Sequence, residues 1–286
     1  MDKYRHWIQS FFAILFNGYG KGWLSGKIYT GPGKNICVPV LNCYSCPGAL
    51  GSCPIGSLQA VLGSNGRTFS FYVLGTILLF GTILGRLICG FLCPFGWLQD
   101  LLYKIPLKKK NEPRIIKTYG IYFKYVFLVL FVFILPLSMK NEFGISSPYF
   151  CKYICPAGII EGALPLMALD PGLRSIVGFL FAWKFLFAIS IIGLSMIWYR
   201  PFCKYICPLG AIYGLLNRFS AVQLEFSSSK CIHCRKCVKA CKMNVEPYKN
   251  PTSPECIRCG DCVRACPVDA LELAIYKKKE CEKVIQ

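Results

Sequence analysis

The sequence contains little charge and almost no histidine. Of its 286 residues, 16% are charged and 54% are hydrophobic, and the two histidines are His6 and His233. A disordered chain combines low hydrophobicity with high charge, so this composition excludes disorder and is unusual for a soluble globule. Both histidines suit structural positions better than catalytic ones, and no acid–base group for catalysis is evident. The composition therefore favours a membrane protein.

Several binding signatures and one sign of charge are also scarce. No haem motif C-x2-C-H occurs, because Cys234 is followed by Arg235, and no nucleotide or flavin fingerprint follows a predicted strand. Only 14 Asp and Glu stand against 33 Lys and Arg, a formal charge of +19. The basic residues flank apolar segments, as the positive-inside rule places them, and ligated cysteines are negatively charged thiolates. We therefore expect no nucleic-acid partner.

Apolar segments predict four membrane spans. Three of them, residues 69–90, 120–139 and 175–199, have the length of about 20 residues that a hydrocarbon core of about 30 Å requires. The shorter segment 7–19 is ambiguous between a signal peptide, an interfacial helix and a short span. We interpret it as an uncleaved first span, because four spans bring both termini to one side.

Basic residues in the loops predict the orientation of these spans. Loop 91–119 carries six Lys and Arg, whereas loop 20–68 carries four and loop 139–174 carries three. Loop 91–119, which includes Lys108, Lys109 and Lys110, should therefore be cytoplasmic. With four spans, both termini are then cytoplasmic in a multi-pass protein of the cell membrane.

Eight cysteines after residue 220 form two C-x2-C-x2-C-x3-C runs, the second followed by Pro267. This is the spacing of bacterial ferredoxins with two 4Fe–4S clusters, in which the fourth cysteine of each run binds the other cluster. The expected ligands are Cys231, Cys234, Cys237 and Cys266 for one cluster and Cys256, Cys259, Cys262 and Cys241 for the other. Zinc knuckles are the weaker alternative, because zinc sites rarely need two complete runs of four. We expect Cys281 to be a free thiol.

Another cysteine motif is duplicated near the ends of two predicted spans. The motif R-x2-C-x3-C-P-x-G occurs from Arg86 and again from Arg200, 114 residues later. Both copies should lie on the cytoplasmic side, where four thiolates can hold one 4Fe–4S cluster at the membrane surface: Cys89, Cys93, Cys203 and Cys207. Both arginines would lie beside its negative charge. The alternative is that these cysteines only pack between helices.

The loops on the opposite side repeat the same contexts. Cys53 precedes a sequence that resembles the one after Cys93, and C-K-Y-I-C-P occurs at Cys151–Cys155 as it does at Cys203–Cys207. With the C-x2-C pair at 43–46, five cysteines lie in these outer loops: Cys43, Cys46, Cys53, Cys151 and Cys155. Cys37 is a sixth. They can hold one more cluster at the outer surface. Alternatively, Cys43 and Cys46 form a redox-active dithiol.

These patterns predict a mainly α membrane protein with four transmembrane helices in two internal repeats, plus a C-terminal α+β domain. Residues 1–220 should form the four-span domain with the paired C-x3-C-P motifs. Residues 221–278 should form a bacterial-type ferredoxin domain with two 4Fe–4S clusters, and residues 279–286 a charged tail. Two lysines fall within predicted spans: Lys124 can reach the interface, and Lys184 marks a candidate site for a quinone headgroup or a cluster counter-charge.

The inner and C-terminal cysteine motifs resemble those of NapH-type quinol dehydrogenase membrane subunits and of the polyferredoxin parts of NosR-like regulators. The resemblance covers nearly the whole chain and rests on Cys89, Cys93, Cys203, Cys207 and the eight cysteines from Cys231 to Cys266. It implies electron transfer associated with a membrane quinone or a redox partner protein. It does not fix the partner.

Three functions remain open at this point. The first is an integral-membrane electron carrier, or a quinol dehydrogenase-type subunit, that passes electrons from a cytoplasmic donor or quinol to a membrane or extracytoplasmic acceptor. The second is a transmembrane conduit that reduces exported disulfides through Cys43 and Cys46. The third is a redox-sensing membrane regulator, which the lack of a DNA-binding or kinase-like segment disfavours. The partners common to all three are the lipid bilayer and redox proteins.

Overall fold

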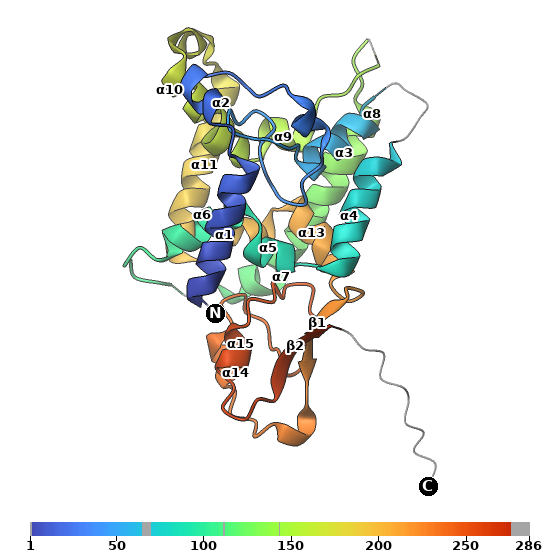
Figure 1. Cartoon of the computed structure of the whole chain (residues 1–286), viewed down its shortest axis with the longest axis vertical. Coiled ribbons are helices and arrows are strands. Elements are labelled where there is room, and N and C mark those ends of the chain that lie inside the picture. The colour runs from blue at the N-terminus through green and yellow to red at the C-terminus, as the bar shows by residue number, and fades with distance from the viewer. Residues whose placement is uncertain (1, 65–69, 111, 143, 276–286) are drawn as a thin grey trace.

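The computed structural model describes residues 2–64, 70–110, 112–142 and 144–275. Within these ranges the chain is mainly helical, with one two-stranded sheet near its C-terminal end (Figure 1). Three predicted features lie outside the described residues: Cys281, the tail 279–286 and the first residue of the expected span 69–90.

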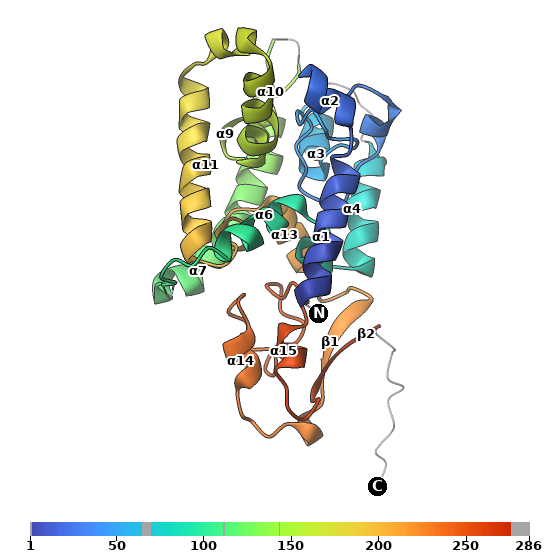
Figure 2. The same cartoon turned by 60° about the vertical axis from the view of Figure 1, so that its left-hand side comes forward.

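Long helical segments run side by side along the long axis of the molecule (Figures 1 and 2). They are α1 (Asp2–Phe16), α4 (Phe71–Ile83), α11 (Phe179–Ile197) and a continuous segment made of α7 (Arg114–Phe127), the π-helical η2 (Leu128–Ile134) and α8 (Leu135–Ser138). Two of these segments are long and apolar enough to cross a membrane: Arg114–Ser138 with 25 residues and α11 with 19. They correspond to the predicted spans 120–139 and 175–199.

The expectation of one helix over 69–90 is wrong. The helix α4 ends at Ile83, and a separate short helix α5 (Leu87–Phe91) follows. Between them Gly85 adopts a φ of +56°, and a Cβ there would lie 2.6 Å from the Asn217 side-chain oxygen. That oxygen accepts a hydrogen bond from the Arg86 N–H at 3.2 Å. Glycine tolerates this left-handed turn, which the apolar composition alone does not indicate.

Short helices begin directly after cysteine–proline pairs. In α3 (Pro54–Leu62), α6 (Pro94–Tyr103) and α13 (Pro208–Leu216) the cysteine is the N-cap and the proline is the first helical residue. Proline is favoured there because its fixed φ suits the first turn and its missing N–H has no helical partner. Each such helix directs the positive end of its dipole toward its cysteine.

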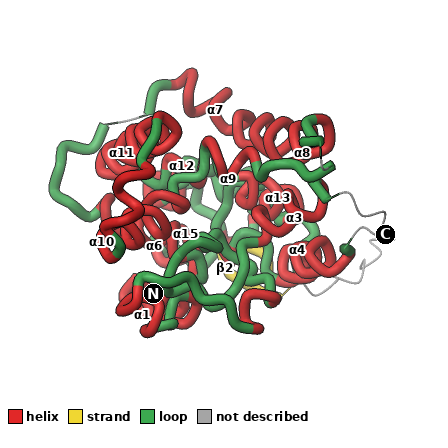
Figure 3. The backbone as a smooth tube through the Cα atoms, turned by 90° about the horizontal axis from the view of Figure 1, so that it is seen from above, coloured by secondary structure: helices red, strands yellow, loops and turns green. Residues whose placement is uncertain are grey.

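The first cysteine of each C-x3-C pair lies on a preceding short helix: α5, α9 (Tyr149–Tyr153) or α12 (Pro201–Tyr205). The remaining helices of this part lie mostly at the end away from the C-terminal domain, and they are α2 (Gly20–Ser25), η1 (Pro32–Asn35), η3 (Gly158–Ala163), α10 (Leu164–Leu169) and η4 (Pro171–Ile176). Seen from above, α1, α4, α7 and α11 lie toward the periphery, and α9, α12 and α13 lie between them (Figure 3).

The C-terminal domain has a small sheet and short helices. The strands β1 (Val222–Phe226) and β2 (Leu271–Ile275) pair antiparallel, with Leu224 opposite Leu273. Its helices are η5 (Ser228–Lys230), α14 (Lys236–Ala240) and α15 (Asp261–Arg264). Leu224, Cys262 and Leu271 form its own buried cluster. The α+β architecture expected for residues after 220 is therefore present.

A larger buried core joins the rest of the chain and extends into the C-terminal domain through Met243, Val245 and Ile257. It contains Cys53 and Cys155 of the outer set together with Cys89, Cys93 and Cys207 of the inner set. Backbone hydrogen bonds close the loop between Cys37 and Ser52 at its two ends. The loop turns inward, so that Val40, Leu41 and Asn42 are buried. The two cysteine sets therefore share one core, whereas the sequence placed them at two separate membrane surfaces.

Candidate iron–sulfur sites

Four cysteines of the C-terminal domain surround one cavity of about 360 Å³. They are Cys231, Cys234, Cys237 and Cys266, the set predicted for the first ferredoxin cluster. Backbone N–H groups already point at two of the sulfurs: His233 N lies 3.4 Å from Cys231 Sγ, and Ala270 N lies 3.3 Å from Cys266 Sγ. Such donors stabilise a negatively charged cluster.

The second ferredoxin group repeats this local geometry. His233 and Arg235 flank Cys234 with φ values of 53° and 57°, and Arg258 and Gly260 flank Cys259 with 53° and 80°. The pKa of Cys262 is raised by burial and further by Cys256, Cys259 and Cys241, which places the four thiols of the predicted second cluster near one another. Thiols crowded in this way become thiolates when a metal binds them.

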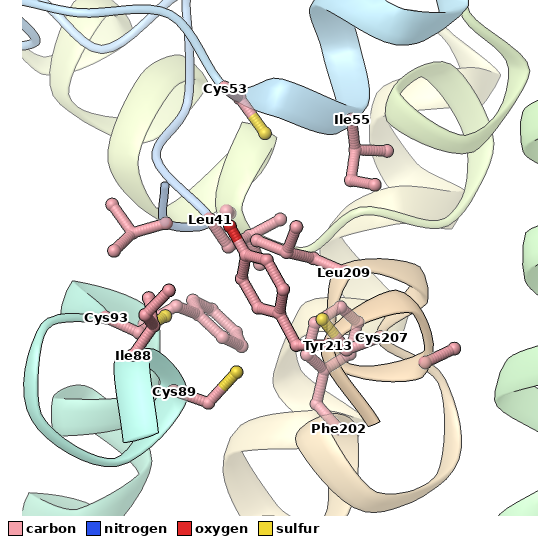
Figure 4. Packing of buried hydrophobic residues seen from close by; sticks show 14 of the residues in the cluster. Leu41, Cys53, Ile55, Ile88, Cys89, Cys93, Phe202, Cys207, Leu209 and Tyr213 are labelled. Atoms are coloured by element: carbon pink, nitrogen blue, oxygen red, sulfur yellow. The ribbon is translucent and has the colours of Figure 1, made fainter. Parts of the chain in front are cut away.

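The inner cysteines converge from the two halves of the membrane part. Cys89, Cys93, Cys203 and Cys207 all line one small void of about 10 Å³, and Figure 4 shows Cys89 and Cys93 on one side with Cys207 on the other. Burial raises the pKa of Cys207, and Cys203 and Cys89 raise it further. The duplicated motif thus brings four thiols together, as its sequence predicts.

Each inner motif is held by the arginine of the other. Arg86 donates to the Cys203 carbonyl at 3.1 Å, and Arg200 donates to the Cys89 carbonyl at 2.6 Å. Both guanidinium groups are completely buried. Gln99 completes the exchange: its Nε2 lies 3.0 Å from Cys203 Sγ, and its Oε1 accepts from the Phe202 N–H at 3.2 Å.

Buried carboxylates balance these arginines. Asp100 accepts hydrogen bonds from Arg200 and from Arg5, and these bonds hold the pKa of this carboxyl well below its usual range although burial opposes them. Glu255 of the C-terminal domain pairs with Arg86 at 2.8 Å and also with Lys124. Lys124 is completely buried, so the expectation that it reaches the interface is wrong. Its ion pair with Glu255 instead helps to dock the C-terminal domain beside the inner site.

The outer cysteines lie around a cavity with a volume of about 550 Å³. Cys37, Cys43, Cys53, Cys151 and Cys155 line it, and Cys46 does not. Lys184 also lines the cavity, and its Nζ donates to the Cys151 carbonyl at 3.1 Å. Gln59 Nε2 lies 3.4 Å from Cys151 Sγ. Lys184 therefore belongs to the surroundings of the outer cysteines.

The donor sets suit clusters better than single metal ions. Among the described residues, no three His, Cys, Asp or Glu side chains are grouped so as to hold one metal ion. Zinc requires four ligands close around one centre, with Zn–S bonds of about 2.3 Å. The four thiolates of a 4Fe–4S cluster bind different irons, so they lie farther apart than the ligands of one zinc ion. The ferredoxin thiols around the cavity of about 360 Å³ agree with that spread and favour a cluster over zinc knuckles.

Sequence reasoning missed the side chains that support the cysteines. Gln59, Gln99, Glu161 and Tyr213 all stand six residues after the second or only cysteine of a C-P motif. Each of them contacts another motif or loop: both glutamines bind a cysteine of a partner motif, Glu161 accepts from the Cys43 N–H at 2.9 Å, and Tyr213 donates to the Pro39 carbonyl at 3.0 Å. Aligning the four C-P motifs beyond their glycine would have revealed this position.

A family described as a 4Fe-4S binding domain matches residues 66–113, 123–164 and 179–226. Each of these ranges contains one C-x3-C-P pair, at Cys89, Cys151 or Cys203. Two further 4Fe-4S binding domains match residues 224–245 and 254–272. The chain belongs to the 4Fe-4S binding family. No solved structure matches it.

Relatives of this family occur in archaea and bacteria. The chain is 30% identical to MJ0750 of Methanocaldococcus jannaschii over 64% of its own length and 69% of that protein. It is 23% identical to YccM of Escherichia coli over 60% of this chain and 46% of YccM. It is 26% identical to the regulatory protein NosR of Stutzerimonas stutzeri over 60% of this chain and 21% of NosR. The resemblance to NosR-like proteins is thereby confirmed, and the chain spans less than half of YccM and NosR.

Proposed function

We propose that this chain is an integral-membrane iron–sulfur protein that passes electrons between a cytoplasmic donor or quinol and a membrane or extracytoplasmic acceptor. The observation that carries the proposal is the convergence of the inner motifs, because four thiols from positions 114 residues apart meet in one core beside a ferredoxin domain. YccM, which is named for electron transport, supports the same function. A bound 4Fe–4S cluster takes up and releases one electron at a time.

Surface composition supports the membrane part of the proposal. A core helix of a soluble protein is mostly buried, whereas only 28% of the apolar window in Arg114–Ser138 and 17% of that in α11 is buried. Large apolar side chains on α1 and α4 are exposed as well, among them Trp7, Phe11, Phe71 and Leu79. A soluble monomer rarely exposes so continuous an apolar surface. We therefore infer four spans formed by α1, α4, Arg114–Ser138 and α11.

The chain's own residues would prepare the inner site for a cluster. Three roles can be assigned: Cys89, Cys93, Cys203 and Cys207 provide the ligands, Arg86 and Arg200 clamp the two motifs, and the helix starts at Pro94 and Pro208 present positive dipole ends. All three features favour a group of negative charge. Burial excludes water from the thiols, since their residues are at most 7% exposed.

Membrane topology provides the first prediction. A reporter fused after Lys110 or at Gln286 is expected to read as cytoplasmic, and one inserted near Gly63 as exported, because the loop charges favour this orientation. The helix directions agree, since α4 and α11 both run toward the end of the molecule that carries the C-terminal domain (Figure 1). If the reporters at Gly63 and Lys110 report the same side, α4 does not cross the membrane.

Vesicle experiments test electron passage itself. The full chain is reconstituted in sealed vesicles with an impermeant reductant on the ferredoxin side and an impermeant acceptor enclosed on the other side. We expect reduction of the enclosed acceptor, and none in protein-free vesicles. Absence of transfer by a protein that has all its iron would contradict passage across the bilayer and favour a one-sided, quinone-linked ferredoxin.

A further inference from the structure

We propose that the outer cavity is a fourth 4Fe–4S site, held by Cys43, Cys53, Cys151 and Cys155. The inference deepens the proposed function and rests on it, because it supplies the site nearest to an extracytoplasmic acceptor. It selects four ligands from the six outer cysteines and excludes the dithiol at Cys43 and Cys46.

Matched glutamines give the first argument. Gln99 donates to Cys203 Sγ and accepts from the Phe202 N–H at the inner site. Gln59 does the same at the outer site, donating to Cys151 Sγ at 3.4 Å and accepting from the Phe150 N–H at 2.9 Å. Two glutamines at the same place after a C-P pair thus hold the first cysteine of a C-x3-C pair in the same way. The outer arrangement copies the inner one in structure as well as in sequence.

Loop closure gives the second argument. The N–H of Cys155 donates to the Phe150 carbonyl at 2.9 Å, and the N–H of Cys207 donates to the Phe202 carbonyl at 3.0 Å. Each bond links the second cysteine of a pair to the residue before the first, so both loops direct their two cysteines alike. Cys53 caps α3 as Cys93 caps α6. Three of the four inner ligands therefore have outer counterparts: Cys53, Cys151 and Cys155.

The fourth ligand has no counterpart in sequence, because Ala49 occupies the position that corresponds to Cys89. Cys43 takes its place in space. It lines the cavity and interacts electrostatically with Cys151 and Cys155. Among the other cysteines, Cys37 interacts only with Cys53, and Cys46 lies outside the lining.

Glycines leave room beside two of the four proposed sulfurs. A Cβ added at Gly162 would lie 3.4 Å from Cys43 Sγ, and one added at Gly56 would lie 3.7 Å from Cys151 Sγ. A side chain at either position would begin in contact with the thiol.

Charge in the cavity favours an anionic occupant. Lys34 and Lys184 line it, and none of the lining residues is Asp or Glu. Outside the lining, Glu161 accepts from the Cys43 N–H at 2.9 Å. A 4Fe–4S cluster with four thiolate ligands is negatively charged, and nearby cations tune its reduction potential. The volume of the outer cavity, about 550 Å³, also exceeds that of the ferredoxin cavity, about 360 Å³.

Proximity of the two sets gives the site a role. The backbone N–H of Leu41 faces the Cys93 thiol, and the next one along the chain, that of Asn42, faces Cys53. Tyr213 is completely buried and extends from the inner cysteines toward Cys53 (Figure 4). The outer and inner sets thus lie on two sides of one tyrosine and one short backbone segment. An electron therefore does not need to cross a hydrocarbon core of about 30 Å in one step.

Iron counting of the full chain tests the proposal. After anaerobic purification we expect about sixteen irons per chain from four clusters, and about twelve after the double change Cys53→Ser and Cys155→Ser. Matched controls are Cys37→Ser and Cys46→Ser, which are expected to keep about sixteen. Paramagnetic resonance of the reduced protein should show the loss of one centre with the ferredoxin signals unchanged.

Other results would overturn the assignment. A count of about twelve irons in both the unmodified protein and the double variant would refute the outer site while leaving the proposed function intact. A loss of iron in Cys46→Ser, or a disulfide between Cys43 and Cys46 in the purified protein, would refute the ligand set. Failure of the ferredoxin and inner centres to form would instead refute the proposed function.

Gln59→Leu provides a second readout that retains every cysteine. Loss of its N–H donor should lower the midpoint potential of one centre, since donors to sulfur stabilise the reduced, more negative state. The matched variant Gln99→Leu should lower the potential of a different centre. If Gln59→Leu shifts no centre, or the same one as Gln99→Leu, the outer cavity does not hold a cluster.

Discussion

Replacing Asp100 with asparagine is expected to destabilise the protein by about 3–5 kcal/mol. Asp100 is 4% exposed and accepts hydrogen bonds from Arg5 and from Arg200, whose Nε and Nη2 lie 2.7 and 2.5 Å away. Asparagine preserves the shape but leaves two buried guanidinium groups without a counter-charge. Breaking a buried pair by removing one partner costs far more than losing a surface pair, because the remaining charges are uncompensated.

Thermal unfolding of the solubilised protein measures this effect. The midpoint should fall by about 10 °C, given the usual 2–4 °C per kcal/mol for chains of this size. Glu142→Gln is the matched control, since Glu142 is exposed and its neutralisation should change stability by less than about 0.5 kcal/mol. Equal midpoints for Asp100→Asn and the unmodified protein would show that the two buried arginines do not need the Asp100 carboxylate as a counter-charge.

Replacing Cys207 with serine is expected to remove the inner cluster and leave the ferredoxin pair. Cys207 and three other cysteines line one void, so they constitute a single ligand set. Serine is a poor ligand for iron in place of thiolate, and the count should fall by about four irons per chain. Iron and sulfide analysis, together with paramagnetic resonance of the reduced protein, provide the measurement.

Two comparisons make the Cys207 result specific. Cys93→Ser should produce the same loss, because Cys93 comes from the other motif of the same site. Cys37→Ser should cause none, although Cys37 is buried in the same core. Unchanged iron in either Cys207→Ser or Cys93→Ser would contradict a site shared between the two motifs.

Local spacing made the ferredoxin domain predictable. Eight cysteines within 36 residues, Cys231 to Cys266, leave the chain few ways to arrange them, and positive φ values at His233 and Arg258 shape the two loops alike. The apolar segments 120–139 and 175–199 were equally predictable, because length and hydropathy are properties of the segment itself. The segment 69–90 was not, since its break at Gly85 depends on a contact with Asn217.

Lys124 shows the same limitation for charge. A lysine near the end of an apolar segment usually extends to the interface. Here a carboxylate 131 residues later, Glu255, pairs with it, and the lysine is completely buried. No local pattern identifies a partner at such a separation, and the same holds for the exchange of Arg86 and Arg200 between the inner motifs.

The sequence by itself determined which cysteines belong together within each motif, that the motif is repeated, and that apolar helices carry it. Those properties follow from spacing and composition over a few turns of chain. Only the tertiary structure decided that the loop 37–52 turns inward, so that Cys53 and Cys93 lie on either side of Leu41 and Asn42. It also decided that Gln59 and Gln99 each bind a cysteine about 100 residues away. Contacts of that range arise from how the helices pack together, and no short segment encodes them alone.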